Sequence, residues 1–326
     1  MDEIENMKTS YKLSIVIPVY NEAGNIKPLT DRLKAVVGKL SCKYEIIFVL
    51  DPCADNTEQL ILDLHKNDNA IKLLRMSRRF GQPACTMAGL HYASGDACVV
   101  IDADLQDPPE LIGDMVRKWQ DGYDVVYAQR ISRKGETLIK RIVSYCGYWL
   151  INKISDVKIP RNTGDFRLMS KRVVEELRKL REHDGFLRGL VAYVGFRQIG
   201  ILYNRDERLK GKGNYNKLFG SLRIGFNGVL GFSKYPLHLI SILGLVISSL
   251  SFLLGIIYLL LKLLQVDIKW GNPTLVILVS FLSGIQLLSL GIMGQYFARI
   301  YDEVQKRPVF IIDKAVGLND DETGGK

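Results

Sequence analysis

The first part of the chain alternates short apolar runs with longer stretches in which apolar residues recur at helical spacing. The apolar runs predict buried β-strands at about residues 12–21, 44–50, 71–75 and 97–101. The stretches between them predict helices over about residues 25–40, 57–65 and 82–93. Because strand and helix alternate, the pattern predicts an α/β fold with a doubly wound, mostly parallel sheet.

Polar residues follow the predicted strands where each one ends: Asn21, Asp51, and the pair Asp102 and Asp104. Ligands of a doubly wound sheet bind beyond the carboxyl ends of its strands. If the extended geometry persists past Ile101, the two paired carboxylates point to one side and can bridge a divalent cation. Mg²⁺ or Mn²⁺ is commonly held by one or two carboxylates plus substrate phosphates, which indicates a nucleotide-diphosphate substrate. A polar loop after a strand is the alternative.

Two further features bear on this region. Asp107, which precedes two prolines, is expected to be the N-cap of the next helix. No G-x-G-x-x-G or G-x-x-x-x-G-K-[ST] pattern occurs here, so neither a dinucleotide dehydrogenase nor a P-loop ATPase is supported. A phosphate substrate is therefore expected to be held by a cation and basic side chains.

Two later stretches, residues 239–261 and 270–298, contain no charged residue. Each exceeds the roughly 20 residues that span a bilayer core, and they predict transmembrane helices over residues 237–263 and 271–298. Residues 216–236 mix apolar and basic positions, which suits amphipathic helices at the membrane interface, with a buried linker as the alternative. Basic residues flank the outer ends of the two spans. The N-terminal domain and a C-terminal tail over residues 299–326 are thus expected in the cytosol.

Charge and cysteine content narrow the class of protein. The net charge is +9, and the excess of lysine and arginine lies in the middle of the chain, next to the apolar spans. That arrangement favours anionic lipid headgroups or phosphates over nucleic acid, because no nucleic-acid-binding signature accompanies it. The five cysteines form no C-x-x-C pair, so neither a disulfide framework nor a zinc site is expected. The first residues lack the apolar core of a signal peptide.

Several motifs together resemble a known family. The segments Ser14–Glu22, Asp51–Asp55 and Asp102–Asp107 resemble the nucleotide-sugar half of inverting family 2 glycosyltransferases with the A-type fold. Ser77–Gly81, Gly164–Met169 and the two apolar spans narrow the resemblance to the polyprenyl-phosphate glycosyltransferases. That group includes the dolichol-phosphate mannose synthases and, most similar to this chain, the bacterial bactoprenol glucosyltransferases. The resemblance implies a catalytic domain over residues 1–215.

The resemblance also implies roles for individual residues. The nucleotide sugar is expected to contact Pro18, Tyr20, Asn21, Glu22, Asp51, Asp102 and Arg208. A Mg²⁺ or Mn²⁺ cofactor is expected on Asp102, Asp104 and Gln106. Asp104 and Asp165 are the expected catalytic residues, with Asp165 facing sugar and acceptor as a base or orienting group; a helix cap is its alternative role. Asp51 is expected to contact the nucleobase of the donor. The family usually has D-D-G-S-T-D where this chain has Leu50–Asp55, so the sequence does not decide between uracil and guanine as that base.

The basic middle of the chain supplies candidates for an acceptor phosphate. Guanidinium groups bind a phosphate dianion bidentately, which favours Arg130, Arg133 and Arg141, although a solvated basic face is the alternative. Residues 204–215 form a charged loop, for which the family pattern is close to R-x-x-G-x-S-K. In this chain Arg208 and Gly211 fit the pattern, but Gly213 and Asn214 stand where it has serine and lysine. Lys212 is expected to take the cationic role there, and a surface turn is the alternative.

The sequence thus predicts a membrane-bound, metal-dependent, inverting hexosyltransferase. Glucose from UDP-glucose is the first choice of donor and polyprenyl phosphate the acceptor, giving a lipid-linked sugar for the cell envelope at the bacterial inner membrane. A GDP-mannose-dependent mannosyltransferase and a non-catalytic membrane scaffold are the alternatives. The expected partners are the sugar donor, the lipid acceptor and the membrane, with a homo-oligomer left open and no nucleic acid. Since a phosphate acceptor is already ionised near neutral pH, it needs little help from a base.

Overall fold

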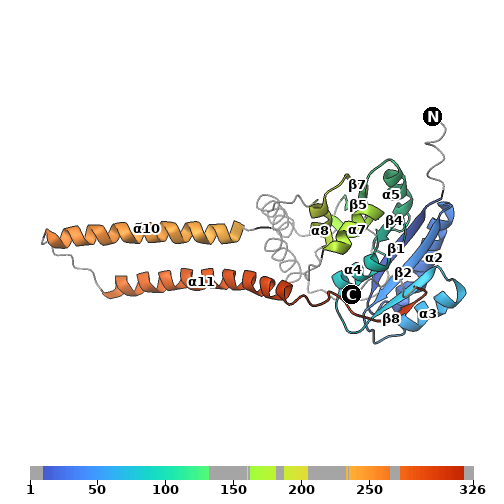
Figure 1. Cartoon of the computed structure of the whole chain (residues 1–326), viewed down its shortest axis with the longest axis horizontal. Helices are drawn as coiled ribbons and strands as arrows, with labels where there is room; N and C mark the ends of the chain where they lie inside the picture. Colours follow the sequence, from blue (N-terminus) through green and yellow to red (C-terminus); the bar gives the residue numbers. More distant parts are fainter. Residues whose placement is uncertain are drawn as a thin grey trace. The chain divides into compact units, whose positions relative to one another are not determined.

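Two separate structural units make up the chain. The computed structural model describes residues 10–131, 160, 162–180, 187–204, 233, 235–264 and 272–318. The first unit, here called the α/β unit, contains the sheet together with the last part of the chain, from Pro308 onward. The second, here called the helical unit, contains the two long helices between them in sequence (Figure 1).

In the residues that the structure describes, eight strands form one sheet in the order β7-β5-β6-β4-β1-β2-β3-β8. The strands are β1 (Lys12–Val19), β2 (Lys43–Leu50), β3 (Ile71–Met76), β4 (Ala97–Val100), β5 (Val125–Arg130), β6 (Thr163–Ser170), β7 (Gln198–Tyr203) and β8 (Ile312–Val316). The helices of this unit are α2 (Ala23–Lys39), α3 (Thr57–Asn67), α4 (Gln82–Tyr92), α5 (Leu111–Gln120), α7 (Lys171–Lys179) and α8 (Leu187–Val194).

The strand directions bring many loops to one end of the sheet. Strands β3, β2, β1 and β4 are parallel neighbours, and β5 and β7 are parallel to each other. Strand β6 runs antiparallel between β4 and β5. Strands β1 to β5 and β7 therefore end where β6 begins, at what is called here the carboxyl end of the sheet. The prediction of an α/β fold with a doubly wound, mostly parallel sheet is confirmed.

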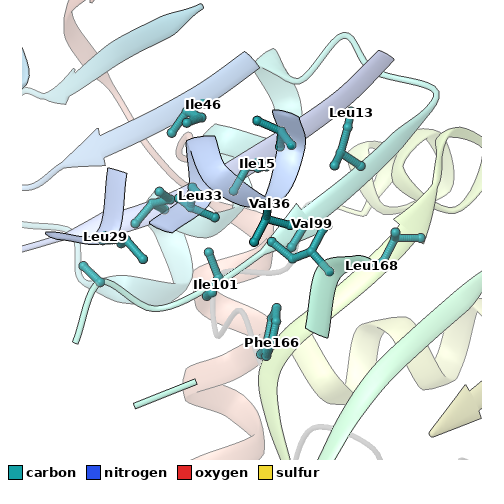
Figure 2. Packing of buried hydrophobic residues seen from close by; sticks show 14 of the residues in the cluster. Leu13, Ile15, Leu29, Leu33, Val36, Ile46, Val99, Ile101, Phe166 and Leu168 are labelled. Carbon is teal, nitrogen blue, oxygen red and sulfur yellow. The ribbon is translucent and has the colours of Figure 1, made fainter. Parts of the chain in front are cut away.

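Alternating apolar side chains bury both faces of the central strands. Figure 2 shows Leu29, Leu33 and Val36 of α2 packed near Ile15 of β1 and Val99 of β4. This cluster continues into β6 through its buried aromatic and aliphatic side chains. Because successive residues of a strand point to opposite faces, the remaining positions of β1 and β2 meet α4 on the other side.

Helix α5 begins later than the sequence suggests. Its N-cap is Glu110, so the prediction that Asp107 is the N-cap is wrong. The backbone N–H groups of Leu111 and Ile112 donate to Pro108 O and Pro109 O at 3.2 and 3.0 Å, and the prolines thus form a turn that precedes the helix. The carboxylate of Asp107 is directed elsewhere, as described below.

Strand β8 was not predicted. It pairs antiparallel with β3, within the stretch that the sequence analysis assigned to a C-terminal tail. Ser77 N donates to Ile311 O at 2.9 Å, and Arg75 Nε lies 3.3 Å from Asp313 Oδ2. The last part of the chain therefore completes the edge of the sheet beside β3.

The helical unit consists of α10 (Tyr235–Leu263) and α11 (Asn272–Val304), which lie side by side and run antiparallel (Figure 1). Their most apolar stretches, Tyr235–Leu254 and Ile277–Val304, have mean hydropathies of 2.2 and 1.9. Helices that are apolar all round require an apolar environment. They are two candidate transmembrane helices in the described part of the chain, and the second runs past its predicted end at residue 298. The amphipathic helices predicted over residues 216–236 lie mostly outside the described residues.

Candidate functional site

The loop after β1 is tied to the loop after β2. Asn21 adopts a left-handed backbone conformation with φ of 54°. Its side-chain Oδ1 accepts a hydrogen bond from Ala54 N at 2.9 Å, and its own N–H donates to Cys53 Sγ at 3.1 Å. Asparagine tolerates this conformation better than most residues, so Asn21 can reverse the chain and join the two loops at the same time.

Asp51, directly after β2, is buried, with an exposed fraction of 2%. Its Oδ1 accepts from Phe80 N at 3.0 Å and its Oδ2 from Gly81 N at 2.8 Å. Gly81 has φ of 93°, which favours glycine, and it precedes the first turn of α4. Asp51 therefore anchors the start of α4, and its contact with a nucleobase stays a prediction. Burial, followed by the charge of Asp51, raises the pKa of the nearby Cys85 thiol.

The segment after β4 turns sharply. The strand ends at Val100 and the backbone turns at Ala103 and Asp104, so the expectation that extended geometry aligns Asp102 with Asp104 is wrong. Leu105 has φ of 58°, an unusual conformation for a bulky side chain, and it is 1% exposed. In this turn the apolar Leu105 side chain belongs to the buried core cluster. Backbone outliers of this kind cluster at ligand sites.

Polar contacts fix the two carboxylates. Gln82 Nε2, in the first turn of α4, donates to Asp102 Oδ1 at 2.7 Å. Asp104 is 7% exposed, and its Oδ1 accepts from Gln106 N at 3.1 Å. The turn thus keeps the predicted ligands close in sequence and space, while the helix start holds one of them from the side.

The oxygen donors suit a hard cation. Asp102, Asp104 and Gln106 offer two carboxylates and an amide on one turn, and Mg²⁺ or Mn²⁺ prefers such oxygens. Within the described residues, no group of three or more His, Cys, Asp or Glu side chains is placed to hold a metal. A cation bound here would need further oxygens, and substrate phosphate and water are its usual sources. The donor set therefore fits an ion shared with a diphosphate.

Arg130, Asp107 and Tyr203 form a buried network at the ends of neighbouring strands. Arg130 and Tyr203 are paired residues at the ends of β5 and β7. The Tyr203 hydroxyl donates to Asp107 Oδ1 and accepts from Arg130 Nε at 3.2 Å. Burial, then the charge of Asp107, raises the pKa of Tyr203 to about 12, so the hydroxyl keeps its proton. Arg130 Nη2 lies 3.9 Å from Asp107 Oδ1.

Asp165, near the start of β6, is surrounded by cations. Arg188 Nε of α8 donates to Asp165 Oδ1 at 2.9 Å, and the carboxylate side chain is 26% exposed. Burial alone would raise the pKa of Asp165, but the charges of Arg188, Arg167 and Arg130 outweigh it and hold the pKa below its ordinary value. Asp165 lies within the strand and caps no helix, because α7 begins at Lys171 with Ser170 as N-cap.

Two arginines lie against Gly164, the residue before Asp165. A Cβ on Gly164 would lie 3.0 Å from Arg130 Nη2, so a larger residue there would push that guanidinium aside. Arg167 is 3% exposed, and its Nη2 donates to Gly164 O at 2.8 Å. Burial lowers the pKa of Arg167 to about 10, which leaves it charged near neutral pH.

The structure gathers the described site residues at the carboxyl end of the sheet. Pro18 is buried at the end of β1, the ring of Tyr20 lies 4.1 Å from the Arg79 guanidinium, and Glu22 N donates to Thr57 Oγ1 at 3.1 Å. The predicted residues Arg133, Arg141, Arg208 and Lys212 lie outside the described residues.

Five residues at this end of the sheet were not predicted to be site residues: Gln82, Asp107, Arg167, Arg188 and Tyr203. Gln82 directly follows the Ser77–Gly81 motif, which was the available signal. Tyr203 ends a predictable apolar strand immediately before a charged run. Arg188 carries no local signal, because only the tertiary fold brings it to Asp165.

Comparison with known proteins identifies the family. Glycosyl transferase family 2 matches residues 14–178, about half of the chain. The chain is also 44% identical over 311 residues to the uncharacterized glycosyltransferase sll0501 of Synechocystis sp., covering 94% of this chain and 96% of that relative. The chain belongs to glycosyl transferase family 2. The family resemblance predicted from the motifs is confirmed.

The chain is also similar to a second, more distant relative in sequence and to a solved structure. This family 2 glycosyltransferase is 38% identical over 306 residues to the SfII prophage-derived bactoprenol glucosyl transferase of Shigella flexneri, covering 93% of this chain and 98% of the relative. Among solved structures, glucosyl-3-phosphoglycerate synthase from Mycobacterium tuberculosis matches 70% of this chain and 81% of its own, with 18% identity and a TM-score of 0.45. That structural similarity is too remote to carry an argument about ligands.

Proposed function

We propose that this family 2 glycosyltransferase transfers a single hexose, glucose from UDP-glucose as first choice, to polyprenyl phosphate. The observation that carries the proposal is the division of the carboxyl end of the sheet into two parts. Asp102 and Asp104 follow β4 on one side, and Arg130, Arg167 and Arg188 surround Asp165 on the other. The first part suits a cation with a diphosphate and the second an anionic acceptor.

The relatives support the choice of acceptor. The bactoprenol glucosyl transferases of Shigella flexneri and Shigella phage SfV are each 38% identical to this chain and cover more than nine-tenths of it. Bactoprenol is a polyprenyl lipid, and the two candidate transmembrane helices suit an enzyme whose acceptor lies in a bilayer. In this proposal the α/β unit and the C-terminus share the cytosolic side of the membrane.

The chemistry assigned to each side chain follows from its surroundings. A phosphate oxygen of the acceptor attacks the anomeric carbon in line with the departing diphosphate and inverts that centre. When bound at Asp102, Asp104 and Gln106, Mg²⁺ or Mn²⁺ supplies positive charge next to the leaving group. Arg130 binds the acceptor phosphate and turns it toward the sugar. Asp165 stays ionised because of its arginine neighbours, so its role is to orient sugar and acceptor, since an ionised phosphate needs no strong base.

The decisive experiment is a transfer assay with purified full-length protein. Undecaprenyl phosphate is incubated with labelled UDP-glucose, other UDP-hexoses and GDP-mannose, each with Mg²⁺ or Mn²⁺, and label in the lipid phase is measured. We expect transfer from one donor, with UDP-glucose the first choice. Label from GDP-mannose alone would support the mannosyltransferase alternative, and no transfer from any donor would support the scaffold.

A variant pair tests the cation site in the same assay. Asp104→Asn removes one charge from the turn after β4 and should abolish transfer while the protein still inserts into membranes. The matched control is Asp121→Asn, which breaks only a surface pair with Lys118 at 3.1 Å and should transfer at the wild-type rate. Full activity in Asp104→Asn would refute the cation site.

A further inference from the structure

In the buried network of Arg130, Tyr203 and Asp107, the arginine makes no direct hydrogen bond to the carboxylate. Arg130 Nη2 lies 3.9 Å from Asp107 Oδ1, too far for a hydrogen bond, although both side chains are largely buried, with 14% and 0% exposure. The Tyr203 hydroxyl stands between them: it donates to Asp107 Oδ1 and accepts from Arg130 Nε at 3.2 Å.

The backbone makes this placement rigid. Arg130 and Tyr203 are paired across β5 and β7, and Ile131 N donates to Tyr203 O at 3.0 Å just beyond them. On the other side, Arg130 N donates to Asn162 O at 3.0 Å. Tyr203 is 4% exposed, so neighbouring atoms hold its ring in place. The hydroxyl is therefore fixed where the carboxylate and Nε can both use it.

The outer nitrogen Nη2 of Arg130 lies beside the start of β6. It lies over Gly164, next to Asp165, where a Cβ would come within 3.0 Å. In the ranges that the structure describes, no hydrogen bond engages Nη1 or Nη2. The guanidinium thus uses one edge for Tyr203 and keeps its outer nitrogens for another partner. A phosphate group is the partner that two such nitrogens fit.

We propose that Tyr203 is a positioning residue for the acceptor: its hydroxyl separates Arg130 from Asp107, so that the arginine binds the lipid phosphate and not the carboxylate. This inference rests on the proposed function, because it assigns the acceptor phosphate to Arg130. Without the hydroxyl, Asp107 Oδ1 loses the hydrogen bond from Tyr203, and Arg130 Nη2, 3.9 Å away, can move in to replace it. A direct Arg130–Asp107 pair would then withdraw the outer nitrogens from the acceptor.

The test is steady-state transfer by the full-length protein, with undecaprenyl phosphate and the donor that the panel above identifies. Tyr203→Phe keeps the ring and removes the hydroxyl. Its KM for undecaprenyl phosphate should rise by about 10- to 100-fold, the range expected when one hydrogen bond to a charged group is lost. Its KM for the nucleotide sugar and its kcat at saturating acceptor should stay within about twofold of wild type.

A second variant separates positioning from loss of folding. Asp107→Asn removes the charge that attracts Arg130, so the double variant Tyr203→Phe/Asp107→Asn should recover most of the acceptor affinity lost in Tyr203→Phe. Two sites that act independently would add their effects instead. The control is Tyr44→Phe, which removes a hydroxyl that donates to Asp68 Oδ2 at 3.4 Å and should leave both KM values unchanged.

The outcomes distinguish this inference from the proposed function. No transfer by wild-type protein defeats the proposed function, and an unchanged acceptor KM in Arg130→Lys defeats the assignment of the phosphate to Arg130. If Arg130→Lys raises the acceptor KM but Tyr203→Phe does not, only the positioning role of Tyr203 is overturned. Equal rises in both KM values, or additive effects in the double variant, overturn it as well.

Discussion

A buried carboxylate at the opposite end of the sheet makes the stability of the α/β unit sensitive to acid. Glu45, near the start of β2, has 1% side-chain exposure, and its Oε2 lies 2.9 Å from Lys12 Nζ and 2.6 Å from Lys72 Nζ. Its Oε1 accepts from Ser14 Oγ and from Ser94 N at 2.5 and 2.8 Å. Burial by itself would raise the pKa of Glu45, but these donors outweigh burial and lower the pKa to about 2 from an ordinary 4.5.

The size of the effect follows from the two pKa values. A group whose pKa is lower in the folded state stabilises the fold above its unfolded pKa and loses that contribution as the pH falls through its folded pKa. For Glu45 the window runs from an unfolded pKa near 4.5 down to a folded pKa of about 2. The full contribution is about 3 kcal/mol, and about 2 kcal/mol of it is lost between pH 5 and pH 3.

The prediction is tested by comparing wild-type protein with Glu45→Gln. Pulse proteolysis of the full-length protein in detergent, at increasing urea and between pH 5 and pH 3, gives the free energy of unfolding of the α/β unit. The variant should be less stable than wild type by about 3 kcal/mol at pH 7, because it leaves two lysines without their buried partner. The difference should shrink by about 2 kcal/mol at pH 3, where wild-type protein has lost most of the same contribution.

An exposed carboxylate provides the control. Glu110 pairs with Arg32 at 2.6 Å, and its side chain is 57% exposed. Glu110→Gln should change the free energy of unfolding by less than about 1 kcal/mol at every pH. A constant difference between wild type and Glu45→Gln from pH 5 to pH 3 would refute the lowered pKa, and equal effects of the two substitutions would refute the importance of burial.

Two further predictions concern packing and charge. Gly89→Ala should destabilise the α/β unit by about 1–3 kcal/mol, since its Cβ would lie 2.2 Å from Val16 Cγ1. The control is Gly113→Ala in α5, where the new Cβ meets open space and should stabilise the unit slightly. Urea unfolding measures both free energies of unfolding, and equal effects of the two substitutions would contradict the packing argument. Arg188→Met should raise the pKa of Asp165, because it removes the arginine that is hydrogen-bonded to this carboxylate. The acidic limb of the pH–rate profile for sugar transfer should therefore move to higher pH. An unmoved limb would show that the ionisation of Asp165 does not limit transfer.

The local pattern of apolar residues was sufficient to predict the central strands of the sheet. Most residues in each run from β1 to β4 are apolar and each run is bounded by turn residues, so these strands are visible in the sequence. Strand β8 shows the limit of this method. It is five residues long with charged residues at two positions, and it becomes a strand because the exposed edge of β3 offers it hydrogen-bond partners.

The same limit applies to the site. Asn21, Asp51 and the Asp102–Asp104 pair could be placed at the carboxyl end of the sheet from strand order alone. The conformation of Leu105 could not be anticipated, because a leucine carries no preference for positive φ and only burial of its side chain explains it. The pairing of Arg188 with Asp165 likewise depends on how α8 packs against β6, which no local pattern encodes.

Glu45 and Asp51 are buried carboxylates at opposite ends of β2, and they have different partners. At the amino end, lysine ammonium groups neutralise Glu45 within the core. At the carboxyl end, Asp51 accepts hydrogen bonds from the backbone N–H groups of Phe80 and Gly81. The arginines at this end contact other groups: Arg188 donates to Asp165 Oδ1, and Arg130 Nε donates to the Tyr203 hydroxyl. Under the proposed function, a lysine in place of these backbone donors to Asp51 would put a further cation at the end of the sheet where the diphosphate is proposed to bind.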